Sequence, residues 1–521
     1  MVNDPIVEYL ARTHDGAKLR DDLSLEADVV VVGSGAGGGI TAEVLSQAGR
    51  KVIIVEEGPL KTTRDFKMLE KEAMPQLYQE SGARLTKDKG IKILQGRAVG
   101  GSTTVNWTTS LRPPKSTLDF WQRELGLKGI SEADIAPYFD QVERRLSIAP
   151  WSIAPNPNNQ ALFRGAQKLG FETHVIPRNV QGCWNLGYCG LGCPVGAKQS
   201  MLVTTLPEAL KNGAELYYRL RAERFVFEND RIQSLICTAL QEDGAHENKV
   251  SIKMRATQFV LASGAIGSPG LLLRSNAPDP HGIVGSRTFL HPVAASVAFM
   301  PEKVNGFEGA PQSVYSDQFN QLESHQIGFK LEVPPLQPVL AATTLTGIGD
   351  FYRKWVERLP FIHAQLALLR DGFHSASQGG KVYLKSDATP GLDYPISPFL
   401  WQGLQRALLT MAELQFAAGA KEVLPIHEEA QGYSSWSEAK VEIPRLALEI
   451  LRMKIFSAHV MGGCPMGVDP KNSVVDAWGR HRQIENLSLH DGSIFPTSIG
   501  ANPQLSIYAF ALRNAQHLVV N

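Results

Sequence analysis

Three glycines near the N-terminus have the spacing of a dinucleotide-binding loop. Gly33, Gly35 and Gly38 follow the apolar run DVVVV, and Glu56 ends the next apolar run, KVIIV, beyond a helix expected from about Ile40 to Ala48. The first glycine allows a tight turn, the second lets the backbone approach a pyrophosphate, and the third lets the helix pack on the strand. The acidic residue accepts hydrogen bonds from ribose hydroxyls. The pattern predicts a dinucleotide site without distinguishing NAD from FAD.

Three further segments are rich in glycine and other small residues. They are 96–106 (GRAVGGSTTVN), 260–276 (VLASGAIGSPGLLLRSN) and the C-terminal block from His459 onward, which contains HVMGGCPMG and DGSIFPTSIGANPQ. Glycine at this density suits close approach of backbone to a flat, extended ligand, although each segment alone could be a tight turn. If the cofactor were NAD in place of FAD, these three segments would have no explanation.

The composition argues against several classes of protein. The 521 residues include 52 Lys and Arg, 52 Asp and Glu, 43% hydrophobic residues and five cysteines. With no basic excess, nucleic-acid binding is not expected. The N-terminus lacks a basic-then-apolar signal, and prolines break the longest uncharged stretch, between Glu332 and Asp350. We expect an α/β protein of the cytoplasm with reduced cysteines.

Taken together, the glycine-rich segments resemble the glucose–methanol–choline (GMC) family of FAD-dependent oxidoreductases. Residues 96–106 resemble its first signature and residues 264–276 its second, in the family's order, whereas 301–450 resembles it only faintly. Ser110 and Asn276 depart from the usual residues at positions not expected to contact the flavin. The resemblance implies an α/β fold, in which a Rossmann-like FAD-binding domain is interleaved with a substrate-binding cap of antiparallel sheet plus helices.

The resemblance also implies a division of the chain. The main FAD-binding part would be residues 1–295, with inserted lid and cap segments near 60–95 and 110–185. Residues 296–450 would form the cap, and residues 451–521 would return to the FAD domain with the catalytic pair.

Positions that match the family's FAD contacts are spread along the chain. The resemblance implies the following cofactor-binding residues: Gly33, Gly35, Ala36, Gly38 and Glu56 at the ADP half; Gly96, Gly100, Gly101 and Asn106 along the pyrophosphate and flavin; Val226 at the adenine; Asp491 and Gly492 as a second ADP-side contact; and Pro503 beside the isoalloxazine. A helix starting near Pro503 would direct its positive end at the flavin and stabilise its anionic reduced form. Members that tether flavin carry a histidine in the first signature, whereas residues 96–112 contain none, so we expect non-covalent FAD.

The resemblance assigns the chemistry to His459 and Asn502. Histidine suits a general base because its ordinary pKa lies near the operating pH. Asn502 would hydrogen-bond the substrate oxygen and orient it. We expect structural roles for His291 and His490.

Cys183, Cys189 and Cys193 are spaced C-x5-C-x3-C, which fits neither a zinc site nor an iron–sulfur site. We expect no metal here and favour a structural turn, with a disulfide left open for an oxidising compartment. Together with HVMGGCPMG, this segment resembles the long-chain (fatty) alcohol oxidase and cholesterol oxidase-like branch of the family, whose GC-x-x-G-x-K stretch is matched by Gly192 to Lys198.

The function implied is oxidation of a hydrophobic alcohol, long-chain or sterol-like, to an aldehyde or ketone by hydride transfer to flavin N5. The electron acceptor, O₂ or a quinone or cytochrome, stays open, as does the oligomeric state. The same scaffold supports two alternatives, a hydroxynitrile-type lyase and a fatty-acid photodecarboxylase. Residues 351–369, whose charges group near one end, are a candidate for peripheral membrane contact.

Overall fold

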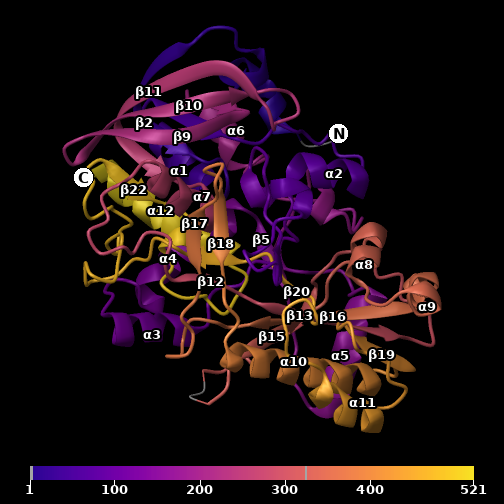
Figure 1. Ribbon diagram of the computed structural model, residues 1–521. Coiled ribbons are helices and arrows are strands. Elements are labelled where there is room, and N and C mark those ends of the chain that lie inside the picture. The colour runs from indigo at the N-terminus through magenta and orange to yellow at the C-terminus, as the bar shows by residue number, and fades with distance from the viewer. Residues whose placement is uncertain (1–3, 323–324, 521) are drawn as a thin grey trace.

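The computed structural model describes residues 4–322 and 325–520 and is built around two eight-stranded sheets. Figure 1 shows the first sheet, with β2, β9, β10 and β11, at one end of the molecule and the second, with β13, β15 and β16, at the other. The C-terminal segments, including β22 and the helix α12, lie with the first sheet, beside elements from the start of the chain.

The first sheet carries the dinucleotide loop. Its order is β1-β8-β3-β2-β11-β10-β9, with β22 also paired to β11. The strands from β1 to β11 are parallel, and β10 and β9 continue antiparallel. The valines of DVVVV are buried, as expected for a β-branched run covered on both faces. The strands are β1 (Thr13–Asp15), β2 (Leu23–Val32), β3 (Val52–Glu56), β8 (Glu215–Tyr218), β9 (Leu220–Glu228), β10 (Arg231–Leu240), β11 (Glu247–Leu261) and β22 (Leu487–Leu489).

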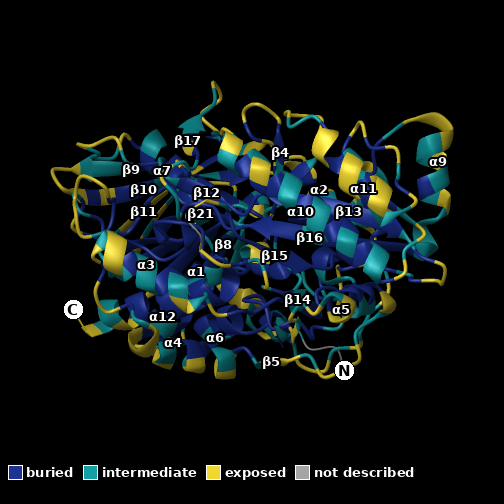
Figure 2. Cartoon of the chain, turned by 90° about the horizontal axis from the view of Figure 1, so that it is seen from below, coloured by how far each residue is buried: buried dark blue, intermediate teal, exposed yellow. Residues whose placement is uncertain are grey.

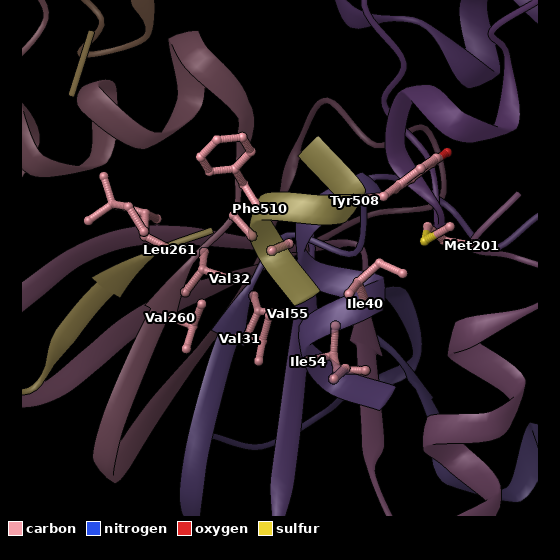
Figure 3. Packing of buried hydrophobic residues seen from close by; sticks show 14 of the residues in the cluster. Val31, Val32, Ile40, Ile54, Val55, Met201, Val260, Leu261, Tyr508 and Phe510 are labelled. Carbon is pink, nitrogen blue, oxygen red and sulfur yellow. The ribbon is translucent and has the colours of Figure 1, made fainter. Parts of the chain in front are cut away.

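Two helices from opposite ends of the chain pack together over this sheet. They are α1 (Ala36–Gln47) and α12 (Gln504–Val520), and α4 (Glu132–Arg145) and α6 (Thr205–Lys211) pack against them. Figure 3 shows core side chains of the central strands next to Tyr508 and Phe510 of α12. The helix α1 begins at Ala36, four residues earlier than the sequence suggested, directly after Gly35.

The second sheet is almost entirely antiparallel. Its order is β4-β20-β13-β16-β15-β14-β6, with β19 also paired to β13. The helices α10 (Pro398–Ala417) and α5 (Pro157–Leu169) pack against each other and against this sheet. In Figure 2 the strands β13 and β16 are buried beneath partly exposed helices. The strands are β4 (Ile91–Ile93), β6 (His174–Val175), β13 (Val293–Phe299), β14 (Val314–Ser316), β15 (Phe329–Glu332), β16 (Ile362–Leu369), β19 (Glu422–Pro425) and β20 (Ile455–Ser457).

The remaining elements are short and lie outside the two large sheets. The remaining α-helices are α2 (Glu70–Leu77), α3 (Lys115–Leu125), α7 (Gly264–Arg274), α8 (Pro338–Thr344), α9 (Gly349–Glu357) and α11 (Trp436–Glu442). Three strand pairs lie outside the large sheets: β5 (Ile148–Pro150) with β7 (Pro177–Asn179), β12 (Thr288–Leu290) with β21 (Val460–Gly462), and β17 (Lys381–Leu384) with β18 (Pro390–Asp393).

The structure corrects two details of the sequence analysis. Residues 455–457 form β20 of the second sheet, so the chain returns to the first sheet only after Ser457 rather than at 451. In the stretch 351–369 only α9 is a surface helix. Residues Ile362–Leu369 form β16, which lies inside the second sheet between β13 and β15 and is not available to a membrane surface. Within residues 4–322 and 325–520, no helix is long and apolar enough to cross a membrane.

The contact between α1 and the C-terminal block depends on Gly37. A Cβ at this position would lie 1.5 Å from the carbonyl oxygen of His490. We expect Gly37→Ala to lower the free energy of unfolding by about 3 kcal/mol, because two backbones must move apart. Gly49→Ala is the control without a steric overlap: no atom lies within 4 Å of the added Cβ, and the variant has only a positive φ of 79° to accommodate, which should cost about 1 kcal/mol. Guanidinium unfolding of both variants measures the difference; equal losses would contradict this account.

Candidate active site

The dinucleotide loop forms a tight turn that touches a second glycine loop. Gly33 has φ 104°, and a Cβ there would lie 2.3 Å from the carbonyl oxygen of Ala262. A Cβ on Gly38 would lie 1.8 Å from the carbonyl oxygen of Gly33, which explains the third glycine of the pattern. Gly35 faces the first signature: a Cβ on Gly101 would lie 2.7 Å from the Gly35 Cα. The two predicted cofactor loops therefore meet at their glycines.

Ser34, which the sequence analysis did not single out, joins three parts of this region. Its hydroxyl and backbone N–H donate to Glu56 Oε2 at 2.6 and 3.1 Å, and its Oγ accepts from the N–H of Gly100 at 3.0 Å. Glu56 Oε1 accepts from the N–H of Gly58 at 2.8 Å. Burial raises the pKa of Glu56, and these hydrogen bonds oppose the rise. Glu56 thus lies where the fingerprint predicts, at the end of β3.

Asp491 fixes the C-terminal block against the second signature. Its Oδ2 accepts from the N–H of Gly264 at 2.8 Å and from the hydroxyl of Ser268 at 2.5 Å. Its Oδ1 accepts from the N–H of Ser493 at 2.8 Å, which caps the short helix at Gly492. The buried carboxylate therefore holds the starts of two helices and leaves mainly backbone at 491–492 to face a ligand.

The remaining predicted cofactor residues lie in or beside these loops, apart from one on a strand. Ala36 begins α1, Pro503 immediately precedes α12, and the N–H of Gly96 donates to Ser102 Oγ at 3.0 Å. Val226 is half-buried in β9, the outermost strand of the first sheet, paired with Ser234 of β10.

The first signature is tied to the start of α12 through Gln504. Asn106 Nδ2 donates to Gln504 Oε1 at 2.5 Å, and Gln504 Nε2 donates to the carbonyl of Thr109 at 2.7 Å and to Ser110 Oγ at 3.0 Å. Ser110, a departure from the family's pattern, is thus a hydrogen-bond partner in this contact. Asn276, the other departure, has φ 49°, a left-handed conformation that asparagine tolerates better than most residues.

Lys198 holds the backbone of the first signature in place through hydrogen bonds. Its buried ammonium donates to the carbonyl oxygens of Thr104, Asn106 and Cys189 at 2.7, 2.8 and 2.6 Å. Burial lowers the pKa of Lys198 to about 8. The three cysteines of this segment lie in and around the turn at Cys189–Leu191, and all five cysteines of the chain are free. Among the described residues, no group of three or more His, Cys, Asp or Glu is arranged to hold a metal ion.

His459 forms a pair with His291, for which the sequence analysis expected only a structural role. The two Nδ1 atoms are 2.9 Å apart and the rings are nearly perpendicular, at 87°. His291 is 3% exposed, whereas His459 keeps an intermediate exposed fraction. One Nδ1 must donate and the other accept, so the pair shares a single proton between its rings. Burial and, second, the charge of Lys330 lower the pKa of His459 to about 3, which leaves the imidazole neutral at pH 7.

Asn502 lies in a second buried group, again with partners that the sequence did not single out. Lys330 Nζ donates to Asn502 Oδ1 at 2.6 Å, and Asn502 Nδ2 donates to Glu332 Oε2 at 3.3 Å. Lys330 and Glu332 form an ion pair of 3.0 Å. Lys330 thus contacts one predicted catalytic residue, Asn502, and its charge acts on the other, His459. The one sequence signal for this buried group was that two charged residues, Lys330 and Glu332, alternate with apolar residues in a short stretch of the chain.

The region can accommodate an extended dinucleotide. Its loops present glycine backbone at Gly35 and Gly101, and a Cβ on Gly101 would overlap the neighbouring loop at the Gly35 Cα, 2.7 Å away. His490 Nε2 and Ser493 Oγ are buried and have no hydrogen-bond partner within residues 4–322 and 325–520. His490 also touches α1, through Nδ1 to Thr41 Oγ1 at 2.9 Å. Buried polar atoms of this kind require a partner, and a polar ligand against these loops would provide one.

Replacing Lys198 tests its support of the first signature. Lys198→Met should lower the free energy of unfolding by about 3 kcal/mol, because three carbonyls lose a charged donor. Lys211→Met, a change of the same kind at an exposed lysine, should stay within about 0.5 kcal/mol. Chemical unfolding of the two variants makes the comparison, and a Lys198→Met protein as stable as Lys211→Met would show that the contacts carry no stability.

Models of the GMC oxidoreductase family match residues 74–293, for its N-terminal part, and residues 376–511, for its C-terminal part. The long-chain-alcohol oxidase FAO4B of Arabidopsis thaliana is 30% identical over 94% of this chain and 68% of its own. The uncharacterized GMC-type oxidoreductase Rv0492c of Mycobacterium tuberculosis is 32% identical over 98% of this chain and 81% of its own.

Solved structures show the same fold at low identity. Pyridoxine 4-oxidase from Mesorbium loti has a TM-score of 0.69 at 17% identity, covering 95% of this chain and 99% of that one. A formate oxidase has a TM-score of 0.70 at 14% identity, covering 96% and 98%. Because the two family models together match well over half of the 521 residues, in the order that the motifs follow, the chain belongs to the GMC family of FAD-dependent oxidoreductases.

Proposed function

We propose that this enzyme oxidises a hydrophobic alcohol, long-chain or sterol-like, to an aldehyde or ketone, with O₂ as the electron acceptor. The long-chain class and the oxidase reaction are supported by relatives such as FAO4B, a long-chain-alcohol oxidase. The observation that carries the catalytic assignment is the neutral, partly exposed His459 beside the buried Asn502 group.

The cofactor is FAD, held by the residues of the glycine loops and by the C-terminal block. We propose that it binds non-covalently, because residues 96–112 contain no histidine and Val105 occupies the position of the tethering residue. When bound, FAD supplies the acceptor for the hydride that leaves the alcohol carbon.

His459 accepts the hydroxyl proton of the alcohol as the carbon–oxygen double bond forms. For His459 Nε2 to have a free lone pair, the proton shared with His291 must reside on His459 Nδ1. His291 then carries its own proton on Nε2, an atom that is buried and without a hydrogen-bond partner among the described residues. In this arrangement His291 Nδ1 accepts the proton of His459 Nδ1, and Asn502 donates from Nδ2 to the substrate oxygen.

Anaerobic reduction of the flavin identifies the substrate class. The purified protein should be yellow, and aliphatic alcohols of increasing chain length, sterols and sugars should be added without oxygen. Long-chain or sterol alcohols should bleach the flavin band, and admission of air should restore it with formation of H₂O₂. A flavin that stays oxidised with every alcohol would refute the proposal and favour a lyase, and bleaching only by sugars would refute the hydrophobic class.

Removing the base should slow reduction while leaving the flavin bound. His459→Ala should lower the limiting rate of anaerobic reduction about 10²–10⁴-fold, the usual contribution of a positioned base. His281→Ala, at an exposed histidine, is the matched control and should reduce at the wild-type rate. Stopped-flow absorbance measures both. Equal rates for the two variants, with full flavin content, would show that His459 is not the base.

A further inference from the structure

A buried ion pair on β15 contacts Asn502 of the proposed catalytic pair. Lys330 and Glu332 lie two residues apart in this strand and contact the same asparagine, so both side chains are on one face. Lys330 is 3% exposed and Glu332 0%. Glu332 also accepts from Gln312 Nε2 at 2.5 Å, and the Lys330 ammonium lies 5.6 Å from the centre of the Tyr315 ring.

Stability alone does not account for a pair buried so deeply. Removing two charges from water costs free energy that their attraction often does not recover, and apolar residues of similar size are frequently as stable. Because Glu332 neutralises Lys330, the pair offers no net charge for binding an anionic substrate. What the pair does contact directly is Asn502.

The pair determines which way the Asn502 amide faces. A lysine ammonium has only donors, and an ionised carboxylate has only acceptors. The amide oxygen must therefore face Lys330 and the amide nitrogen must face Glu332, as the 2.6 and 3.3 Å contacts have it. Only one of the two protons of Nδ2 is used by Glu332, so the other remains as a donor. A flipped amide would meet like groups on both sides.

The same ammonium places a positive charge near the imidazole pair. Lys330 from β15 acts on both rings, and His291 is also affected by His459 and by Arg370 at the end of β16. Lys330 and Arg370 are positive, so both act in the same direction as burial and favour neutral rings, while Glu332 offsets part of the Lys330 charge. A neutral His459 is the form that can accept a proton.

We propose that Lys330 is a positioning residue for the alcohol reaction, which orients the amide of Asn502 as a donor and sets a fixed positive charge beside the His291–His459 pair. This inference rests on the proposed function, because the oriented groups are those assigned to the substrate. Lys330 acts through Asn502 and His459 and needs no contact of its own with substrate or cofactor.

The test compares Lys330→Met with Lys330→Met/Glu332→Gln, in which no unpaired carboxylate remains buried. Lys381→Met, at an exposed lysine of a strand, is the control. Flavin content and unfolding establish that each holoenzyme is folded. The limiting rate of anaerobic reduction by the best alcohol is then measured against pH. In parallel, the titration of His459 is followed without alcohol by NMR of ¹³C-labelled histidine, with the signal assigned from its loss in His459→Gln.

In the wild type, His459 should stay neutral as the pH decreases from 7 to 5, because its pKa is lowered to about 3. Protonation of His459 should therefore not slow the reduction over this range. Both Lys330 variants should keep their flavin. Their reduction should be about ten-fold or more slower at pH 7, and the acid decline and the His459 titration should move up by about one pH unit.

Three outcomes would overturn the proposal. The first is a folded Lys330→Met enzyme with the wild-type rate, pH profile and His459 titration. The second is a slower enzyme with neither the pH profile nor the titration moved. The third is failure of both Lys330 variants to fold with flavin, which would make Lys330 structural. If no alcohol reduces the wild-type flavin, the proposed function fails instead, and the NMR titration still decides whether Lys330 governs His459.

Discussion

The structure depends on direct backbone contact between loops that are distant in the sequence. A Cβ on Gly37 would overlap the carbonyl of His490, and one on Gly101 would overlap the Cα of Gly35. Only residues without a side chain allow such separations, so glycine is required at these points for a steric reason. These contacts join the N-terminal loop, the first signature and the C-terminal block, and so place Ser34, Glu56 and Asp491 relative to one another.

Buried charged side chains hold the same loops in place through hydrogen bonds. Glu56, Asp491 and Lys198 are each satisfied largely by backbone groups of neighbouring loops. In this way each charge fixes the conformation of segments that have no regular hydrogen bonding of their own. Lys330 and Glu332 differ, because their partners are each other and the side-chain amides of Asn502 and Gln312. Such a pair constrains a side chain rather than a loop.

Local patterns predicted the fold well where a pattern and an element coincide. The run DVVVV, the glycine spacing and Glu56 predicted the order β2, α1 and β3 and the position of β3, although β2 begins five residues and α1 four residues earlier than the patterns indicated. The stretch 351–369 was misinterpreted because it spans two elements, a surface helix and β16. A strand buried on both faces is as continuously apolar as a membrane-facing segment, so composition cannot distinguish the two.

The sequence by itself determined the family, the cofactor loops and two candidate catalytic side chains, because these depend on short motifs with fixed spacing. Only the tertiary structure revealed His291, Lys330 and Glu332 as their neighbours. His291 and His459 are 168 residues apart, and Lys330 and Asn502 are 172 apart. Neither separation has a local signature, because the contacts arise where β15 and the segment joining β12 to β13 meet the C-terminal block. Protonation state and amide orientation are set by such neighbours and therefore follow from the folded arrangement alone.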